Sequence, residues 1–254
     1  MPAVRPKKWL GQHFLKDVNI ARKVVSYVNV KNNLLEIGPG MGVLTQFLIE
    51  KETALKVIEI DSESVAYLSK VYKLEKQIIE DDFLKYDLMH VFDGAPFSIV
   101  GNFPYNISSQ ILFKVLSFKH IIPELTGMFQ KEVGKRICAE KGSKTYGILS
   151  VLIQAFYDTK YLFTVEPQVF SPPPKVKSAV IQLTRKNDHI LPCDEKLFFT
   201  LVKAAFNQRR KTLRNALKSF SLTISINEDL KDKRAEQLSV SDFITLAQSV
   251  RDTT

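Results

Sequence analysis

Between residues 34 and 184, short β-forming runs alternate with longer segments of helical pattern, an order that few folds accommodate. The predicted strands are 34–37, 55–60, 77–79, 97–101 and 124–129, and the predicted helices are 42–51, 62–73, 107–117 and 130–140. Strands separated by helices form βαβ units, whose strands run parallel. We therefore expect an α/β fold with a doubly wound, mostly parallel sheet and helices on both faces.

The pattern changes toward the end of the chain. Two runs, 150–157 and 178–184, flank a proline stretch at 172–174 and indicate a late antiparallel pair of strands. Residues 194–250 lack strong β runs. In 197–220 apolar residues recur at helical spacing, namely Phe198, Leu201, Val202, Ala205, Phe206, Leu213, Ala216, Leu217 and Phe220. We therefore predict two domains, 1–186 and a small all-helical domain at 187–254.

Composition limits the classes of partner. The 254 residues carry a formal net charge of +9, which favours a polyanion such as nucleic acid or an anionic membrane surface, although a merely basic soluble surface is the alternative. No apolar run approaches the ~20 residues of a membrane helix, and the polar start does not match a signal peptide. Cys138, Cys193 and the four histidines show no metal-ligand spacing. We expect a cytoplasmic protein without a metal.

A glycine-rich turn follows the first predicted strand, in the sequence Leu35-Glu-Ile-Gly-Pro-Gly-Met-Gly42. Gly38 and Gly40 allow the backbone to approach a ligand closely, and the following helix offers free amide donors. The GxGxG spacing differs from the GxGxxG of dinucleotide sites. Glu36 beside the turn suits a cationic ligand, such as the amino or sulfonium group of S-adenosylmethionine.

Acidic residues follow the next two strands. Glu59 lies at the strand end where a doubly wound fold places the acid that holds ribose hydroxyls. The segment Glu80-Asp-Asp-Phe83 follows the third strand. A carboxylate at that strand end can accept a hydrogen bond from an adenine amino group, while Phe83 can pack on the ring. Acids at strand ends are common, and a solvated acidic loop is the alternative for this second group. Together with the turn, these residues indicate an adenosine-containing cofactor.

A motif suited to amino-group chemistry, Asn102-Phe-Pro-Tyr105, follows the fourth strand. The exocyclic nitrogen of adenine is a poor nucleophile because its lone pair is delocalised into the ring. Acceptors for both of its hydrogens, the side-chain carbonyl of Asn102 and the backbone carbonyl of Phe103, would localise that pair. Pro104 restricts the backbone before it, and Tyr105 can stack on the base. The alternative is a turn with a buried tyrosine.

Phe170 precedes the proline run and is a second aromatic candidate. The prolines would hold the segment extended, so that Phe170 and Tyr105 could clamp an extruded base between them. The alternative is a core phenylalanine at a strand edge.

A basic stretch without acids covers residues 203 to 218, with Lys203, Arg209, Arg210, Lys211, Arg214 and Lys218. Positions 203, 210, 214 and 218 fall close to one face of a continuous helix. A solvated face is the bland interpretation. Beside a base-modifying site, we expect these residues to bind RNA phosphates, and the helical domain to select its substrate by shape.

The chain resembles the ribosomal RNA small-subunit adenine dimethyltransferases over nearly its whole length. The matching segments are 11–15 (GQHFL), 36–42, Glu59, Asp82, 102–105, 169–176 and 205–215. The resemblance implies transfer of methyl groups from S-adenosylmethionine to two adjacent adenines near the 3′ end of small-subunit rRNA, giving N6,N6-dimethyladenosine, with a role in subunit biogenesis. The implied partner is this rRNA within the small subunit or its precursor, and we expect a monomer.

The resemblance also implies roles for individual residues. Gln12, His13 and Leu15 would contact the cofactor, the last two at its methionine end, and Gly38 and Gly40 from the turn. Glu59 would hold the ribose and Asp82 the adenine amino group. Asn102 would touch both cofactor and base. Position 103 is Phe where the family usually has Leu. Two alternatives remain, a large-subunit rRNA adenine methylase and an assembly factor whose binding outweighs catalysis.

Overall fold

The computed structural model describes residues 4–29, 31, 33–218 and 226–249. The chain divides into two compact units, Met1–Gly134 with Thr159–Arg185, and Lys135–Asp158 with Lys186–Thr254. The second unit thus contains 135–158, a segment that the sequence assigned to the first domain. Each unit is described by itself.

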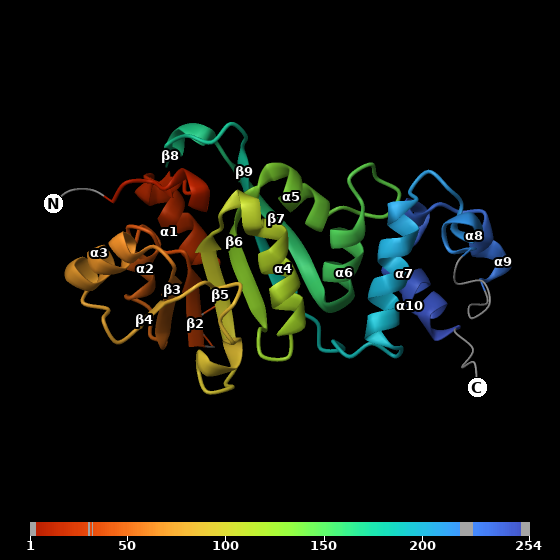
Figure 1. Cartoon of the computed structure of the whole chain (residues 1–254), viewed down its shortest axis with the longest axis horizontal. Helices are drawn as coiled ribbons and strands as arrows, with labels where there is room; N and C mark the ends of the chain where they lie inside the picture. The colour runs from red at the N-terminus through yellow and green to blue at the C-terminus, as the bar shows by residue number, and fades with distance from the viewer. Residues whose placement is uncertain (1–3, 30, 32, 219–225, 250–254) are drawn as a thin grey trace. The chain divides into compact units, whose positions relative to one another are not determined.

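A seven-stranded sheet organises the first unit (Figure 1), in the order β4-β3-β2-β5-β6-β9-β7. Five strands run parallel and β9 is antiparallel to β6. The strands are β2 (Asn33–Ile37), β3 (Leu55–Glu59), β4 (Ile78–Glu80), β5 (Phe97–Asn102), β6 (Glu124–Gln130), β7 (Tyr157–Val165) and β9 (Ser178–Arg185). This arrangement confirms the doubly wound α/β prediction.

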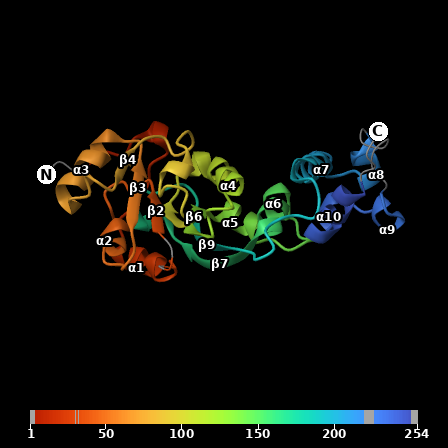
Figure 2. The same cartoon turned by 90° about the horizontal axis from the view of Figure 1, so that it is seen from below.

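Helices cover both faces of the sheet, and α1 and α2 lie on the face opposite α4 (Figure 2). Buried side chains of α1 and α2 share one cluster with Leu34, Val57 and Val100 of the strands. The helices of this unit are α1 (Val18–Ser26), α2 (Thr45–Leu48), α3 (Ser62–Tyr72), α4 (Ser108–Ser117) and α5 (Lys131–Ile137), which runs into the second unit. The predicted helices at 42–51 and 130–140 are therefore shorter than expected.

The N-terminal segment joins a distant part of the chain. Strand β1 (Phe14–Leu15) pairs antiparallel with β8 (Phe170–Ser171), which follows the short 3-10 helix η4 (Pro167–Val169). Three further 3-10 turns are η1 (Lys8–Leu10), η2 (Leu88–His90) and η3 (Tyr105–Ile107). Both η1 and η3 lie at the edge where the parallel strands end, which is where α/β ligand sites form.

The second unit is helical. It contains α6 (Ile148–Phe156), α7 (Glu195–Asn207), α8 (Leu213–Ala216), α9 (Glu228–Lys231), η6 (Ala235–Gln237) and α10 (Val240–Gln248). The predicted strand at 150–157 is wrong, because Ser150–Phe156 belongs to α6 and only Tyr157 begins β7. A short, wholly apolar run does not distinguish a buried helix from a strand by periodicity. Strand β9 pairs antiparallel with β6 and is hydrogen-bonded to β7 on its other side, so its late partner is Tyr157–Val165 and not 150–157.

The predicted continuous helix over 197–220 is also interrupted. Helix α7 ends at Asn207, and Thr212 forms an isolated antiparallel bridge with Arg234. The backbone N–H of Leu213 donates to the carbonyl of Lys233 at 2.7 Å. This long-range pairing overrides the local helical periodicity, and Phe220 lies outside the described residues. Within the described ranges, no helix has the length and apolar character needed to cross a bilayer.

Candidate active site

A cavity of about 270 Å³ opens at the carboxyl ends of β2, β3 and β5. It brings together most of the residues that the sequence singled out: Gln12, His13, Gly38, Gly40, Glu59, Asp82, Phe83, Asn102, Phe103, Pro104 and Tyr105. Leu15 and Glu36 line a smaller adjoining cavity that shares Gly38 and Asn102 with it. The predicted cofactor and reaction motifs therefore meet at one edge of the sheet.

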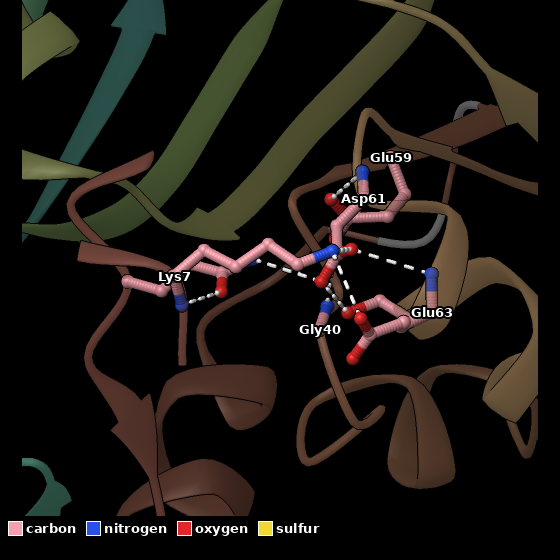
Figure 3. Close-up of polar contacts among 7 residues, drawn as sticks. Lys7, Gly40, Glu59, Asp61 and Glu63 are labelled. Carbon is pink, nitrogen blue, oxygen red and sulfur yellow. Dashed lines mark hydrogen bonds and ion pairs between the residues drawn. The ribbon is translucent and has the colours of Figure 1, made fainter. Parts of the chain in front are cut away.

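Glu59 is fixed at the end of β3 by two backbone donors (Figure 3). The N–H of Gly40 donates to Oε2 at 3.0 Å and the N–H of Asp61 to Oε1 at 2.9 Å. The residue is 4% exposed. Burial raises the pKa of Glu59, although the hydrogen bonds from Asp61 and Gly40 oppose this. The carboxylate is thus held rigidly, with lone pairs left for hydroxyl donors of a ligand.

The two glycines of the turn have different tasks. Both have positive φ, +63° at Gly38 and +55° at Gly40. A Cβ on Gly38 would meet nothing within 4 Å, and this residue lines the cavity, so such a Cβ would occupy ligand space. A Cβ on Gly40 would lie 2.7 Å from the ring of Phe14. Gly38 therefore leaves room for a ligand, whereas Gly40 leaves room for the N-terminal segment.

Glu36 is 1% exposed and accepts a hydrogen bond of 2.6 Å from the hydroxyl of Thr45. Burial raises its pKa to about 8, the Thr45 bond opposes the shift, and the charge of Glu59 adds to it. A buried carboxyl of this kind favours a nearby cation, since a positive charge would stabilise its ionised form. Its place beside the turn agrees with the predicted cationic ligand.

The loop after β4 carries Asp82 and Phe83. Oδ1 of Asp82 accepts from the N–H of Leu84 at 2.9 Å, and Phe83 is 5% exposed. Lys114 of α4, which the sequence analysis missed, donates to the carbonyls of Leu84 at 3.0 Å and Tyr86 at 2.5 Å. Its ammonium also lies 5.4 Å from the centroid of the Phe83 ring. Burial lowers the pKa of Lys114. This lysine holds the acidic loop against the cavity.

Asn102 ends β5 with its amide oriented by the N-terminal segment. Its Nδ2 donates to the backbone carbonyl of His13 at 2.9 Å. Because a carbonyl only accepts, this bond fixes which side of the amide carries the NH₂ group. Oδ1 of Asn102 is consequently left as the acceptor at the cavity, as the predicted chemistry requires.

Phe103 contributes its backbone to the cavity and its ring to the core. The ring is 1% exposed and lies 4.8 Å, between centroids, from the ring of Phe129. A Cβ on Gly127 would lie 2.3 Å from this ring, and one on Gly101 would lie 2.7 Å from it. Two glycines on adjacent strands thus make room for a phenylalanine at position 103. Neither was recognised from the sequence.

Tyr105 follows Pro104, whose φ is −59°. The Tyr105 ring stacks with the His13 ring at a centroid separation of 5.6 Å and an interplanar angle of 29°. The Tyr105 hydroxyl shares a hydrogen bond of 2.5 Å with Oγ of Ser178, a partner that the sequence analysis missed. Burial raises the pKa of Tyr105, and the bond to Ser178 opposes this. The tyrosine is therefore anchored from two sides and presents a ring to the cavity.

Phe170 is not part of this arrangement. It is 1% exposed, pairs with Leu15 across β1 and β8, and belongs to the core cluster beneath α1 and α2. The predicted clamp with Tyr105 is therefore absent from this conformation, because the Phe170 ring is enclosed by apolar side chains. Here the core alternative describes Phe170.

The basic residues of the second unit do not share one helix face, because α7 ends at Asn207. Arg209 pairs with Glu236 at 2.9 Å and donates to the carbonyl of Lys144 at 2.9 Å. Arg214 pairs with Asp232 at 3.2 Å. The other four, Lys203, Arg210, Lys211 and Lys218, are exposed. Arg209 thus has a structural task, while Arg210 and Lys211 in the turn project their charge into solvent.

Comparison with protein families and sequences gives one consistent result. The pattern of the family described as "Ribosomal RNA adenine dimethylase" matches residues 4–252. A protein of Flavobacterium johnsoniae named "Ribosomal RNA small subunit methyltransferase A" is 60% identical, covering 98% of this chain and 97% of its own length. A protein of the same name from Bacteroides thetaiotaomicron is 59% identical, with coverage of 99% and 96%.

Solved structures show the same architecture. A dimethyladenosine transferase from Plasmodium falciparum superposes with a TM-score of 0.79 at 26% identity, covering 92% of this chain and 96% of its own. The 23S rRNA methyltransferase ErmE superposes with a TM-score of 0.68 at 22% identity, with coverage of 92% and 99%. The second similarity concerns the fold alone.

Proposed function

Because the chain belongs to the ribosomal RNA adenine dimethylase family, we propose that it methylates two adjacent adenosines near the 3′ end of small-subunit rRNA. The methyl donor is S-adenosylmethionine, and the product is N6,N6-dimethyladenosine. The substrate is the rRNA within the small ribosomal subunit or its precursor. The enzyme acts as a cytoplasmic monomer and contributes to subunit biogenesis.

The observation that carries this proposal is the orientation of Asn102. Its NH₂ group donates to the His13 carbonyl, so Oδ1 is left to accept a hydrogen bond from an amino group in the cavity. The carbonyl of Phe103 is the second acceptor, on a backbone whose N–H is bound to the carbonyl of Met128 at 3.1 Å. Two acceptors placed on the two hydrogens of an adenine amino group draw its lone pair out of the ring. The neutral amine then becomes a better nucleophile without a strong base.

The cavity suits S-adenosylmethionine by the chemistry of its lining. Glu59 can hold ribose hydroxyls, Asp82 can accept from the adenine amino group, and Gly38 leaves the space beside the turn open. Gln12 and His13 line the same cavity, and Leu15 and Glu36 line the adjoining one. When bound, the cofactor supplies a methyl group activated by its sulfonium, and methylation of N6 leaves S-adenosylhomocysteine and a proton. The carboxyl of Glu36 favours the cationic end of that ligand.

Tyr105 orders the target base. Its ring faces the cavity and its hydroxyl is tied to Ser178, so little rotamer freedom is lost when a base stacks on it. Stacking of this kind offsets part of the cost of extruding a base, a few kcal/mol. Exposed basic residues of the second unit, Lys203, Arg210, Lys211 and Lys218, contact RNA phosphates and position the substrate without reading its sequence.

The proposal is tested by methyl transfer from labelled S-adenosylmethionine to small subunits purified from cells that lack the modification. Large subunits and free rRNA are assayed alongside, and the RNA is digested to nucleosides. Dimethyladenosine formed only with small subunits supports the proposal. Label on large-subunit RNA would identify a large-subunit methylase instead. No label on any RNA, with tight binding to small subunits, would identify an assembly factor.

A further inference from the structure

One wall of the cavity is a short stretch, residues 7–13, which we call the N-terminal segment. Trp9, Leu10, Gly11, Gln12 and His13 of this segment all line the cavity. Gly11 ends the 3-10 turn with φ +66°, and a Cβ there would lie 2.6 Å from Oδ1 of Asn106. The segment therefore lies close against the Asn-Phe-Pro-Tyr side of the site.

The segment is anchored firmly at its C-terminal end. His13 Nδ1 donates to the carbonyl of Pro172 at 2.8 Å, and the His13 carbonyl accepts from Asn102. The following residues form β1, which pairs with β8, and the N–H of Lys16 donates to the carbonyl of Val169 at 2.8 Å. Backbone pairing and buried side chains hold this end in place.

The N-terminal end is held by charge instead (Figure 3). The Lys7 ammonium forms an ion pair with Asp61, whose side chain is fully buried, and lies 3.5 Å from Oε1 of Glu63. The Lys7 N–H donates to Oε1 of Gln12 at 2.8 Å, and Gln12 Nε2 donates to Asp61 at 3.4 Å. Lys7 and Gln12 thus bring both ends of the 3-10 turn onto one carboxylate at the start of α3.

Asp61 connects this contact to the residues that hold a ribose. Its own N–H donates to Glu59, which also accepts from Gly40. Its carboxylate accepts from Ser64 Oγ at 2.9 Å and from the N–H of Glu63 at 3.2 Å. Burial opposes the ionisation of Asp61, but hydrogen bonds led by that of Lys7 outweigh it and lower its pKa. The segment, Glu59 and the glycine turn therefore form one hydrogen-bonded chain.

We propose that Lys7 and Asp61 form an ionic latch that holds the N-terminal segment closed over the methyl donor and slows its release. The proposal rests on the proposed function, since it takes S-adenosylmethionine as the ligand of this cavity. Lys7 and Asp61 are positioning residues, because they act through the segment and through Glu59. The latch is open to solvent at one side, with 25% of the Lys7 side chain exposed, so salt can weaken it.

The test uses the full chain and S-adenosylhomocysteine as the probe, without RNA. Lys7→Met removes the cation, Lys7→Arg restores it, and Lys8→Met removes an equal charge from an exposed neighbouring position. Dissociation constants are measured by calorimetry and release rates by stopped-flow fluorescence of Trp9, the one tryptophan of the chain. Time-resolved anisotropy of Trp9 in the unliganded protein reports the motion of the segment itself.

We expect Lys7→Met to release the ligand about tenfold faster and to weaken its binding by about the same factor. Lys7→Arg and Lys8→Met should remain close to wild type, and Trp9 should move faster only in Lys7→Met. Val4, upstream of the latch, is 7% exposed. Because its burial does not depend on the Lys7 ammonium, we expect the loss to be partial.

Three outcomes would overturn the latch, and they differ from one another. Equal release rates for wild type and Lys7→Met would overturn the latch alone. Absence of binding by the wild type would overturn the proposed cofactor and the latch with it. If Lys7→Met does not fold, the salt dependence of the wild type provides the test. NaCl should accelerate release from the wild type more steeply than from Lys7→Arg, because an arginine can form a bidentate pair that resists salt better. Salt-independent release by the wild type would contradict the latch.

Discussion

The hydroxyl of Thr45 donates a 2.6 Å hydrogen bond to Oε2 of Glu36, and both side chains are buried beneath the glycine turn. This contact partly compensates a carboxyl that the fold has removed from water. The compensation is incomplete, since burial still raises the pKa of Glu36 to about 8. Without a cationic ligand, ionisation of the buried Glu36 carboxyl therefore lowers the free energy of unfolding.

Replacing Glu36 by Gln should flatten the dependence of stability on pH. Between the ordinary pKa of 4.5 and about 8, the unfolded state loses the Glu36 proton while the folded state keeps it. The free energy of unfolding of the wild type should thus fall across this window, by up to about 1.4 kcal/mol per pH unit. Glu59, whose pKa is also raised, adds a fall of the same sign that remains in the variant.

The measurement is urea unfolding at a series of pH values for wild type and Glu36→Gln. The difference between the two curves isolates Glu36, and it should widen as the pH rises from 4.5. Parallel curves would show that the buried carboxyl titrates normally and would contradict the shift.

Replacing Gly38 by Ala should impair ligand binding more than folding. The added Cβ enters open cavity space, so it meets no protein atom within 4 Å, but the positive φ costs about 1 kcal/mol. Gly40→Ala is the matched comparison, since its Cβ would lie 2.7 Å from the Phe14 ring and should disturb the fold as well. Thermal unfolding and calorimetric titration with S-adenosylhomocysteine separate the two effects. If binding falls in the same proportion to thermal stability in both variants, the result would argue against a ligand at Gly38.

Phe103→Leu should leave methyl transfer close to wild type. In the proposed function the residue acts through its backbone carbonyl, while its ring packs against Gly101 and Gly127. Leucine leaves part of that space empty, so stability should fall by about 1 kcal/mol. The rate of dimethyladenosine formation and the unfolding midpoint are measured on the same preparations. A large drop in rate without a matching loss of stability would assign the ring a direct contact with substrate.

The basic turn of the second unit should divide into structural and RNA-binding residues. Arg209→Ala removes the ion pair with Glu236 and the bond to the Lys144 carbonyl, and should lower thermal stability. Arg210→Glu with Lys211→Glu should leave stability unchanged but weaken RNA binding and reduce its salt dependence, with a slope change of about one per lost phosphate contact. Filter binding to small-subunit rRNA over a salt series measures this slope. An unchanged slope would show that these residues do not contact RNA.

Much of the site was predictable from the sequence because it is built from strand ends. Glu59 and Asn102 follow apolar β runs directly, and parallel strands bring such ends to one edge. Contacts between distant segments were not predictable. Nothing local indicates that Leu15 pairs with Phe170 and buries it, or that Lys7 reaches Asp61. The break after α7 depends in the same way on the pairing of Thr212 with Arg234.

The helix α6 was missed for a different reason. Its residues Ile148–Phe156 are almost all buried, so the run has neither the period of an exposed helix nor that of a half-buried strand. The contact of Gly127 with the Phe103 ring was likewise not predictable, since Phe103 directly follows β5 and Gly127 lies on the neighbouring strand β6. The sequence therefore predicted the placement of residues that follow strand order, and it did not predict contacts that side-chain packing decides.

The central claim is that the amide oxygen of Asn102 activates the target amine, and Asn102→Ala tests it most directly. Binding of S-adenosylhomocysteine is measured by calorimetry, and dimethyladenosine formation on undermodified small subunits by nucleoside analysis. The account predicts a rate lowered at least about 100-fold, with ligand binding weakened far less. A variant that forms dimethyladenosine at the wild-type rate would contradict it.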